Sequence, residues 1–397
     1  MKKAMNFLIP IIIAIVIAIL VTLNINTTLD TKLASLMQEK DISLMGSKYG
    51  DVVKDKSALD KTLLSNEGTL FLLGSSEMGI QVPQNSINMF PFKGAEYRTS
   101  CFGRAYVQDL QQATYLGAGN MQENQKVTLL LSMQWFEEKD AVLPYNFSVN
   151  FSDMQFYKFL NNPKISEENK QYYCERIYTM LNEAKKYPAE AFYARLYYKP
   201  TLFKKSVKLI FEPYYKAKEY LLDIKDKALL YKELKDLPFK SDKEELKEIN
   251  WADEYDKIKV ENDKNTYKNE FHLDDNYYKK NLTELTKTKG ISKGENPIES
   301  KEIDDYKFFL SVCKDLNIEP YIILLPVNGW YYDYVELPKD KRDAYYDKVK
   351  KIAEDNKVEV LNLKEYENKE GFLTDPKHLG NEGWLKVSEE IYKHFNK

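Results

Sequence analysis

An apolar run from Phe7 to Leu23, preceded by two lysines, opens the sequence. Its length of about 17 residues lies at the lower end of the range for a membrane-spanning helix. A cleaved signal peptide is the competing interpretation, but no small-x-small cleavage site follows the run. We therefore predict an uncleaved signal anchor over residues 1–26, with the lysines in the cytoplasm and the chain from about residue 27 outside.

Five shorter apolar runs follow, and most of them lead through a turn into a helical pattern. They cover residues 68–73, 97–101, 127–131, 321–325 and 358–361. Repeated strand–turn–helix units are typical of a parallel sheet with helices on its faces. The sequence therefore predicts an α/β fold.

Two long polar segments interrupt this pattern. Residues 27–65 are polar with scattered Leu and Met, which indicates a helical stalk or leader. Residues 137–300 are rich in Lys, Glu and Tyr, and helices are predicted there over 166–185 and 205–235. We interpret this middle part as a charged, solvated helical insertion, and the alternative is a docking surface for a partner or polymer. Because the α/β pattern resumes afterwards, one extracytoplasmic domain over 66–397, interrupted by the insertion, explains the chain better than two tandem domains.

The composition excludes several classes of function. The 397 residues carry a formal net charge of −3, so no broad positive field points to nucleic acid. Cys101, Cys174 and Cys313 show no metal-ligand spacing, and their odd number argues against a disulfide framework. Cys101 and Cys313 are predicted to be small core hydrophobes. No metal or other cofactor is expected.

Ser76 is the first candidate for chemistry, because it lies just past Gly74, where a strand ends and a helix begins. A side chain there lies at the carboxyl edge of a parallel sheet, where such folds bind ligands. Free backbone N–H groups at the start of the helix are also suited to hold an oxyanion. The alternative is that Ser75 or Ser76 merely caps the helix, with Glu77 near its first turn.

The sequence contains 3 histidines, and His378 best fits the role of general base. Asp375 lies three residues before it, so that carboxylate can accept the Nδ1–H while Nε2 takes a proton from Ser76. A surface salt bridge or a metal ligand is the alternative, although a metal site would need further ligands. His272, in the charged insertion, and His394, in the last helix, are expected to be solvated.

The order of these residues along the chain discriminates between two hydrolase folds. The serine follows the first strand, whereas the acid and the histidine come together in the last loop. An α/β-hydrolase elbow requires G-x-S-x-G, but Met78 stands where the second glycine belongs. That fold also usually separates its acid and histidine widely. An arrangement of the SGNH (GDSL-like) type fits both facts.

Four short segments of the chain together resemble one family. They are Gly74–Glu77, Ser132–Phe136, Pro326–Tyr334 and Asp375–Trp384. With the N-terminal anchor, this set is similar to the DltD family, the D-alanyl transfer proteins of lipoteichoic acid D-alanylation, within the SGNH hydrolase-like superfamily. The resemblance spans nearly the whole chain, and the charged middle is its least diagnostic part. It implies an SGNH hydrolase-like parallel sheet flanked by helices, with a helical insertion and an N-terminal transmembrane helix.

The resemblance also implies roles for single residues. It aligns Ser76 with the nucleophile of the Gly-Asp-Ser block and Ser75 with the aspartate of that block. Gly103, after the second strand, matches the glycine whose N–H stabilises the oxyanion. An asparagine is usual after the third strand, but this chain has Gln134 and Trp135 there. Gln134 is either a third oxyanion donor or a structural residue, and Trp135 either lines an acceptor groove or packs in the core.

The function that the resemblance implies is acyl transfer at the outer face of a Gram-positive membrane, with Ser76, Asp375 and His378 as catalytic triad. Ser76 would accept a D-alanyl group, and a hydroxyl of the teichoic acid polymer, deprotonated by His378, would then take it. A membrane O-acyltransferase and a D-alanyl carrier of the same pathway are the implied partners. Two alternatives stay open: a thioesterase or cell-wall esterase with the same triad, and a non-catalytic docking protein with a decayed site.

Overall fold

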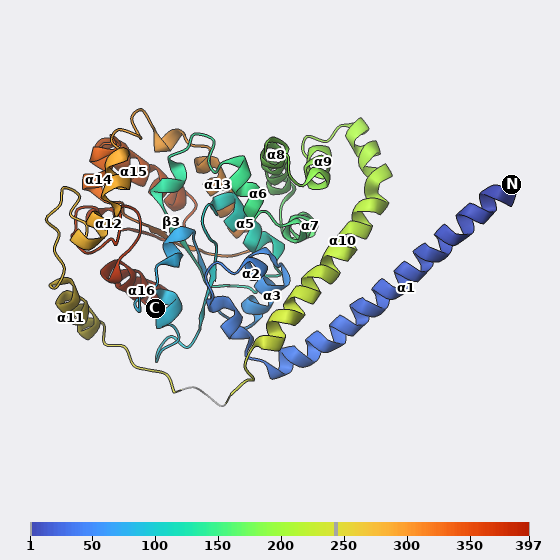
Figure 1. The fold of residues 1–397 in the computed structure, drawn as a ribbon, viewed down its shortest axis with the longest axis horizontal. Helices are drawn as coiled ribbons and strands as arrows, with labels where there is room; N and C mark the ends of the chain where they lie inside the picture. Colours follow the sequence, from blue (N-terminus) through green and yellow to red (C-terminus); the bar gives the residue numbers. More distant parts are fainter. Residues whose placement is uncertain (1, 242–244, 397) are drawn as a thin grey trace.

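The computed structural model describes residues 2–241 and 245–396 and confirms the α/β fold class. Within this part of the chain, a five-stranded parallel sheet has the strand order β2-β1-β3-β4-β5 (Figure 1). The strands are β1 (Leu70–Leu73), β2 (Thr99–Phe102), β3 (Val127–Leu131), β4 (Tyr321–Leu324) and β5 (Val360–Asn362). All five lie close to the apolar runs that predicted them, because strands covered on both faces consist of nearly continuous apolar residues.

The parallel register gathers the carboxyl ends of the strands at one edge of the sheet. In the centre, Phe71 of β1 pairs with Ser100 of β2 and with Val127 of β3. Further along, Leu131 of β3 pairs with Leu324 of β4. The turns that follow β1, β2 and β3 are therefore neighbours in space, at the edge where open α/β sheets bind ligands.

Helices cover both faces of this sheet. The helices on one face include α5 (Asp109–Ala118), α13 (Glu302–Asp315) and α15 (Lys339–Asp355). Those on the other face include α4 (Ser86–Met89) and α16 (Asn381–Phe395). Phe71 and Leu129 point to the first face, and Leu72 and Leu130 point to the second. This division follows from the alternation of side chains along a strand.

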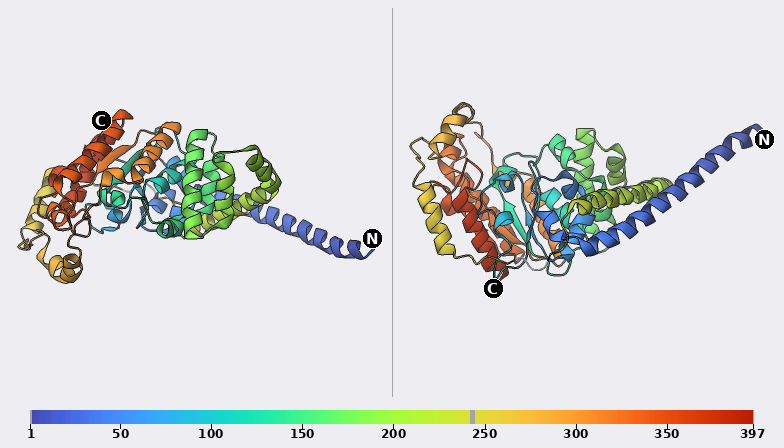
Figure 2. Two further views of the ribbon diagram at one scale, coloured as in Figure 1. Left: turned by 90° about the horizontal axis from the view of Figure 1, so that it is seen from above. Right: turned by 60° about the horizontal axis from the view of Figure 1, so that its bottom comes forward.

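Helix α1 (Lys2–Glu39) continues without a break past the apolar run. Among the described residues it is the one helix that is long and apolar enough to cross a membrane, over Ile9–Glu39, which is consistent with a single-pass anchor. Its large apolar side chains are exposed, from 44% at Ile25 to 61% at Leu20. The N-terminal part of α1 projects away from the rest of the protein in every view (Figures 1 and 2).

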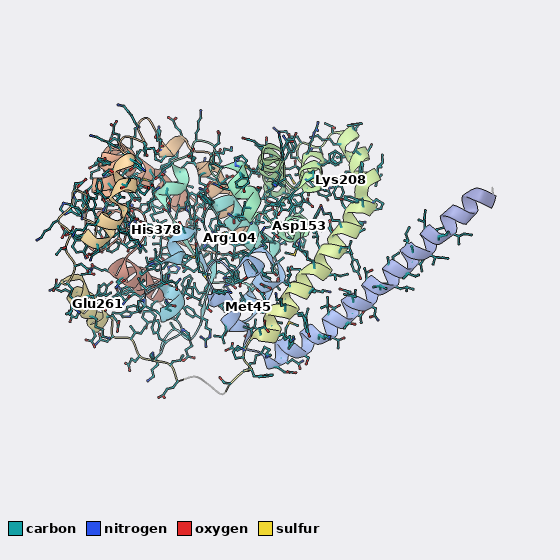
Figure 3. All side chains as sticks on the ribbon, viewed as in Figure 1. Met45, Arg104, Asp153, Lys208, Glu261 and His378 are labelled. Atoms are coloured by element: carbon teal, nitrogen blue, oxygen red, sulfur yellow. The ribbon has the colours of Figure 1, made fainter. Side chains whose placement is uncertain are left out.

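The segment after α1 folds onto the sheet. It forms η1 (Ile42–Ser47), α2 (Val52–Lys56) and α3 (Leu59–Asn66). Leu33 near the end of α1 is buried in the core, together with Ile42 and Met45. Met45 is labelled in Figure 3. The chain between the anchor and the first strand thus contributes apolar side chains to the domain itself.

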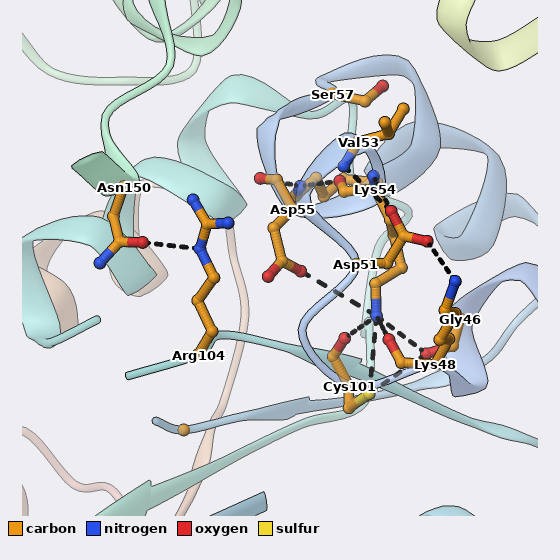
Figure 4. Close-up of polar contacts among 12 residues, drawn as sticks. Gly46, Lys48, Asp51, Val53, Lys54, Asp55, Ser57, Cys101, Arg104 and Asn150 are labelled. Atoms are coloured by element: carbon orange, nitrogen blue, oxygen red, sulfur yellow. Dashed lines mark hydrogen bonds and ion pairs between the residues drawn. The ribbon is translucent and has the colours of Figure 1, made fainter. Parts of the chain in front are cut away.

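Buried Lys54 ties this segment to the end of β2 (Figure 4). Its ammonium group donates hydrogen bonds to the carbonyl oxygens of Gly46 at 3.2 Å and Lys48 at 2.7 Å, and to that of Cys101. The carboxylate of Asp55 lies 4.0 Å from the same nitrogen. A buried ammonium group is strongly destabilising without such partners. The contacts therefore fix Cys101 and, with it, the turn that follows β2.

The chain between β3 and β4 is mostly helical. Its helices are α6 (Pro144–Asn150), α7 (Asp153–Asn161), α8 (Glu167–Ala184), α9 (Pro188–Tyr197), α10 (Leu202–Asp236), α11 (Trp251–Asn262) and α12 (Asp275–Lys287). Phe156 of α7 and Tyr173 of α8 are fully buried in the core of the first face. The same connection also contains α13 and the short helices η3 (Met133–Phe136) and η4 (Pro297–Glu299). Short helices in other connections are η2 (Ser76–Gly79), α14 (Gly329–Tyr334) and η5 (Lys364–Tyr366).

Packing accounts for the cysteines and for two of the histidines. All three cysteines are buried free thiols, which confirms the core positions expected for two of them. His394 stacks on Tyr321 with ring centroids 4.1 Å apart, and its side chain is 17% exposed, so the expectation of a solvated position is wrong there. His272 is partly exposed, stacks on Trp330 and lies 2.7 Å from Glu370.

Candidate active site

Ser76, His378 and Asp375 form a chain of hydrogen bonds at the carboxyl edge of the sheet. The hydroxyl of Ser76 lies 3.0 Å from Nε2 of His378, although 302 positions separate the two residues in the sequence. Nδ1 of His378 lies 2.7 Å from Oδ2 of Asp375. The structure thus brings together the three residues selected from the sequence, in the order hydroxyl, imidazole, carboxylate that an activated serine requires.

In the turn after β1, the hydroxyl groups of the two adjacent serines point in different directions. The N–H of Ser75 donates to the carboxylate of Glu77 at 2.5 Å, and the hydroxyl of Ser75 donates to the carbonyl oxygen of Arg104 at 3.0 Å. Ser76 is the first residue of η2, and its hydroxyl faces the imidazole of His378. Ser75 therefore holds the turn against the chain after β2, whereas Ser76 lies within reach of a base.

Gly103 lets the ends of β1 and β2 approach closely. Its φ is +130°, and a Cβ atom there would lie 1.9 Å from the carbonyl oxygen of Gly74. The side-chain amide of Gln112 donates to the same carbonyl at 2.5 Å. Burial raises the pKa of Asp55, while neighbouring cations and the N–H of Gly103, which faces that carboxylate, oppose the shift. The structure thus places Gly103 behind the serine turn, and it is not among the residues that line the pocket in front of that turn.

The backbone of its own loop holds the carboxylate of Asp375. Oδ1 of Asp375 accepts hydrogen bonds from the N–H groups of Lys377 at 2.8 Å and His378 at 3.0 Å. The N–H of Asn328, at the start of α14, donates to the carbonyl oxygen of Pro376 at 2.9 Å and anchors the loop. One carboxylate oxygen thus accepts hydrogen bonds from the loop backbone, and the other accepts one from the imidazole. A proton held on Nδ1 in this way leaves Nε2 free to face the serine.

Two ionisable groups beside the serine have shifted pKa values. Burial by itself lowers the pKa of His378, but the hydrogen bond to Asp375 and its charge, joined by the charge of Glu77, raise it above the ordinary value. Burial raises the pKa of Glu77 to about 7, against the opposing effects of the N–H groups of Ser75 and Glu77 and of His378. Groups with perturbed pKa values concentrate at functional sites.

A pocket of about 460 Å³ opens in front of Ser76. The turns after the first three strands line it with residues that include Ala105, Gln108, Gln134 and Trp135. A volume of this size lies within the range of small-molecule binding sites. In the described part of the chain, the side-chain amide of Gln134 has no hydrogen-bond partner, so it is available to a ligand. Trp135 is only 2% exposed, and most of its surface packs in the core.

The mouth of the pocket combines apolar and charged side chains. Tyr106 and Leu143 line it and are 60% and 54% exposed. Lys377 lines it beside the histidine loop and pairs with Glu137 at 3.3 Å. Tyr332 donates a hydrogen bond to the other oxygen of Glu137. The mouth thus places an apolar surface next to a lysine that is paired with a carboxylate.

The comparison with known proteins agrees with this arrangement. The family model described as "DltD protein" matches residues 46–396. The chain belongs to the DltD family. Protein DltD of Bacillus subtilis (strain 168) is 28% identical over 342 residues, which cover 84% of this chain and 85% of that protein. Protein DltD of Staphylococcus aureus (strain NCTC 8325 / PS 47) is 24% identical over 368 residues, which cover 90% of this chain and 89% of that protein. Members of the DltD family take part in the D-alanylation of teichoic acids.

Two residues at this DltD-family site were not selected from the sequence. Glu77 was expected near the first turn of a capped helix. It is fully buried there, and its carboxylate accepts a hydrogen bond from the N–H of Ser75. Lys377 lies between the acid and the base and lines the pocket. Both residues lie inside segments that carry the family resemblance, Glu77 in Gly74–Glu77 and Lys377 in Asp375–Trp384, and this position was the one sequence signal that could have selected them. Within residues 2–241 and 245–396, no group of three or more His, Cys, Asp or Glu side chains is arranged to hold a metal ion.

Proposed function

We propose that this chain is a membrane-anchored serine acyltransferase that transfers D-alanine to hydroxyl groups of teichoic acid, including lipoteichoic acid. Membership of the DltD family supports the pathway. The observation that carries the enzymatic part is the 3.0 Å contact between the hydroxyl of Ser76 and Nε2 of His378. A serine that only caps a helix needs no imidazole at its hydroxyl, and this imidazole is in turn oriented by Asp375.

In the first step, Oγ of Ser76 attacks the carbonyl carbon of a D-alanyl ester or thioester, and its proton passes to Nε2 of His378. N–H groups at the start of η2 and the side-chain amide of Gln134 donate hydrogen bonds to the oxyanion of the tetrahedral intermediate. The bond between the carbonyl carbon and the leaving oxygen or sulfur then breaks, and His378 gives its proton to that atom. D-alanine is left esterified to Ser76.

In the second step, a hydroxyl of the polymer gives its proton to His378 and attacks the ester carbonyl. The new intermediate collapses with release of Ser76, which recovers a proton from the imidazole. Asp375 stabilises the imidazolium in both steps. Lys377, at the mouth of the pocket, attracts the phosphate groups of the polymer while the hydroxyl enters.

The location of the enzyme follows from α1. We assign the membrane crossing to its apolar part, with the N-terminal lysines in the cytoplasm and the catalytic domain outside the cell. There the acyl group reaches Ser76 from a membrane O-acyltransferase and a D-alanyl carrier of the same pathway. The exposed side chains of Tyr106 and Leu143 give such a partner an apolar surface beside the pocket.

Complementation of cells that lack their own copy tests the proposal. The full chain is expressed with Ser76→Ala or Ser75→Ala, and ester-linked D-alanine on teichoic acid is measured. We expect Ser76→Ala to abolish the modification and Ser75→Ala to preserve most of it, because the hydroxyl of Ser75 bonds only to a backbone carbonyl. In parallel, mass spectrometry of the purified chain after treatment with a fluorophosphonate is expected to locate the adduct on Ser76.

Two results would overturn the proposal in different ways. A Ser76→Ala chain that is folded, membrane-localised and fully supports D-alanylation would identify a non-catalytic docking protein. Release of free D-alanine from D-alanylated polymer, at a rate independent of added acceptor, would identify a hydrolase with the same triad.

A further inference from the structure

The N-terminal half of α10 exposes a row of large apolar side chains. Leu202, Phe203 and Ile210 are 86%, 76% and 73% exposed. We define the apolar stripe as the six large side chains of this row, which are Leu202, Phe203, Leu209, Ile210, Tyr214 and Leu221. A continuous exposed apolar surface on a folded protein marks a place where something binds.

The stripe occupies one face of the helix. Its members recur at helical spacings, which place side chains on the same side of the axis. Uncharged Ser206, Pro213 and Ala217 lie between them on that face. Lys205 and Lys216, by contrast, fall along one margin, where Lys216 pairs with Glu212 at 2.6 Å. An apolar face bordered by lysines is the pattern of a helix that lies in a lipid–water interface.

The opposite face of α10 is firmly packed against the rest of the protein. Tyr215 and Leu222 are 3% and 9% exposed, and both belong to the main hydrophobic core. Asp226 is 1% exposed and accepts hydrogen bonds from the N–H groups of Ala58 and Leu59. Nearer the N-terminus, the ring of Phe211 contacts that of Phe192 of α9, with centroids 5.6 Å apart. The helix that presents the stripe is therefore held against the rest of the protein by these contacts.

Helix α1 covers the same side of α10 further along the chain. Lys227 pairs with Asp30 at 2.7 Å and donates a hydrogen bond to Asn26 at 2.9 Å. One turn later, the ammonium group of Lys32 lies 5.4 Å from the ring centroid of Tyr231. Towards their N-terminal ends the two helices diverge, so α1 leaves the stripe uncovered (Figure 1). The contacts with Lys227 thus hold α10 next to the point where the apolar part of α1 ends.

We propose that the apolar stripe lies in the surface of the bilayer that α1 enters, as a second membrane contact of this chain. A bilayer around the apolar part of α1 comes close to α10, because Asp30 and Lys227 join the two helices at that level. Lipid acyl chains cover the stripe, while Lys205 at its margin meets anionic headgroups. This inference rests on α1 crossing the membrane and does not depend on the chemistry at Ser76.

The second contact sets the orientation of the domain. A single helix would leave the domain free to swing about its point of attachment, whereas two contacts on one side fix it. His378 lies well away from Lys208 of α10, towards the other side of the protein (Figure 3). The pocket is therefore held at a set distance from the lipid surface, and substrates that are tethered to the membrane must reach it there.

Quenching of a fluorophore by spin-labelled lipids tests this contact. The full chain is placed at one copy per nanodisc containing phosphatidylcholine and phosphatidylglycerol. Ile210→Cys carries an environment-sensitive label, and Val260→Cys on α11, which is 59% exposed, is the matched control. The native cysteines are buried and stay unlabelled. We expect strong quenching at residue 210 by a nitroxide near the headgroups, weaker quenching by one near the methyl ends, and none at residue 260.

Each alternative occupant gives a different result. A label at residue 210 that is open to aqueous iodide and not quenched by lipid nitroxide would overturn the proposal. Shielding that appears only at two or more copies per disc would replace lipid by a second copy of this chain. Shielding that appears only after a membrane protein is added would replace lipid by that partner.

A charge variant checks that the apolar side chains themselves make the contact. Leu209→Glu with Ile210→Glu is combined with a label at Phe203→Cys, and Val260→Glu serves as the control. We expect the double variant to lose most of the quenching at residue 203, and the control to retain it. Unchanged quenching in the double variant would show that the stripe does not bind lipid. Both variants change exposed side chains, and equal midpoints of thermal unfolding verify that they fold.

Discussion

The carboxylate of Glu77 and the imidazole of His378 shift each other's pKa values across the serine turn. Glu77 raises the pKa of His378, and His378 opposes the rise that burial causes in the pKa of Glu77. Asp375 orients the imidazole from one side, and Glu77 acts on it from behind the serine. The base of the proposed mechanism is thus tuned by two carboxylates, of which Asp375 alone bonds to it directly.

Glu77→Gln tests this tuning. The amide keeps an oxygen for the N–H of Ser75 but removes the charge, so the pKa of His378 falls. Because the serine reacts only when the imidazole is neutral, the acidic limb of the rate–pH profile moves to lower pH. The measurement is the rate of fluorophosphonate labelling of Ser76 between pH 5 and 9. An unchanged limb, in a variant whose labelling at high pH is normal, would refute the coupling.

Glu77 also makes stability depend on pH. Its pKa rises from 4.5 in the unfolded chain to about 7 in the folded protein, so the folded state binds the proton more tightly. The stabilisation that this pKa shift gives the folded state is therefore fully present below pH 4.5 and is lost as the pH rises through 7. The free energy of unfolding falls by about 3 kcal/mol in total over that range. Urea unfolding of the wild type and of Glu77→Gln at pH 5 and 8 measures this. We expect the wild type to lose more stability than the variant over that range, and equal losses would contradict the assignment.

Gly103→Ala tests the close approach behind the serine turn. The added Cβ would lie 1.9 Å from the carbonyl oxygen of Gly74 in a backbone with φ of +130°. We expect the free energy of unfolding to fall by about 3 kcal/mol or more, together with reduced labelling of Ser76. Gly294→Ala is the matched control, because φ is +88° there and no atom lies within 4 Å. In that control, the free energy of unfolding is expected to fall by only about 1–2 kcal/mol, and the labelling of Ser76 is expected to be normal.

Asp375→Asn tests the orientation of the base. The amide preserves the shape of the side chain, but it removes the charge that favours the imidazolium and the correct tautomer. We expect the rate of fluorophosphonate labelling to fall by about three to four orders of magnitude. Glu370→Gln, beside the partly exposed His272, makes the same chemical change away from the site and is expected to leave the rate unchanged. A similar rate for both variants would remove Asp375 from the mechanism.

Much of the fold follows from the sequence, because local signals determine it. The run Val127–Leu131 is apolar except for Thr128, and it forms a strand with those bounds. The pairing of Ser76 with His378 was also accessible, since residues after successive parallel strands and the last loop converge at one edge. Their meeting was inferred from residue order and from the resemblance, and not from any local pattern.

Other features depend on contacts that no local pattern reveals. The different directions of Ser75 and Ser76 depend on the carbonyl of Arg104, which lies in the turn after β2. The burial of Glu77 is equally invisible, because a glutamate after two serines is also common in exposed helix starts. The amphipathic face of α10 is encoded in the sequence, but its exposure became visible only once the packed face had been identified.

The proposed nucleophile and its base come from opposite ends of the chain. In the proposed topology the amino end stays in the cytoplasm and the chain after α1 crosses the membrane in order, so Ser76 reaches the outside before His378. During synthesis the serine has no imidazole beside it, and any chain cut short before the last loop is inert. In the proposed mechanism, acyl transfer can therefore begin only after nearly the whole polypeptide has crossed the membrane. The order of the residues along the chain thus prevents an incomplete chain from reacting at the cell surface.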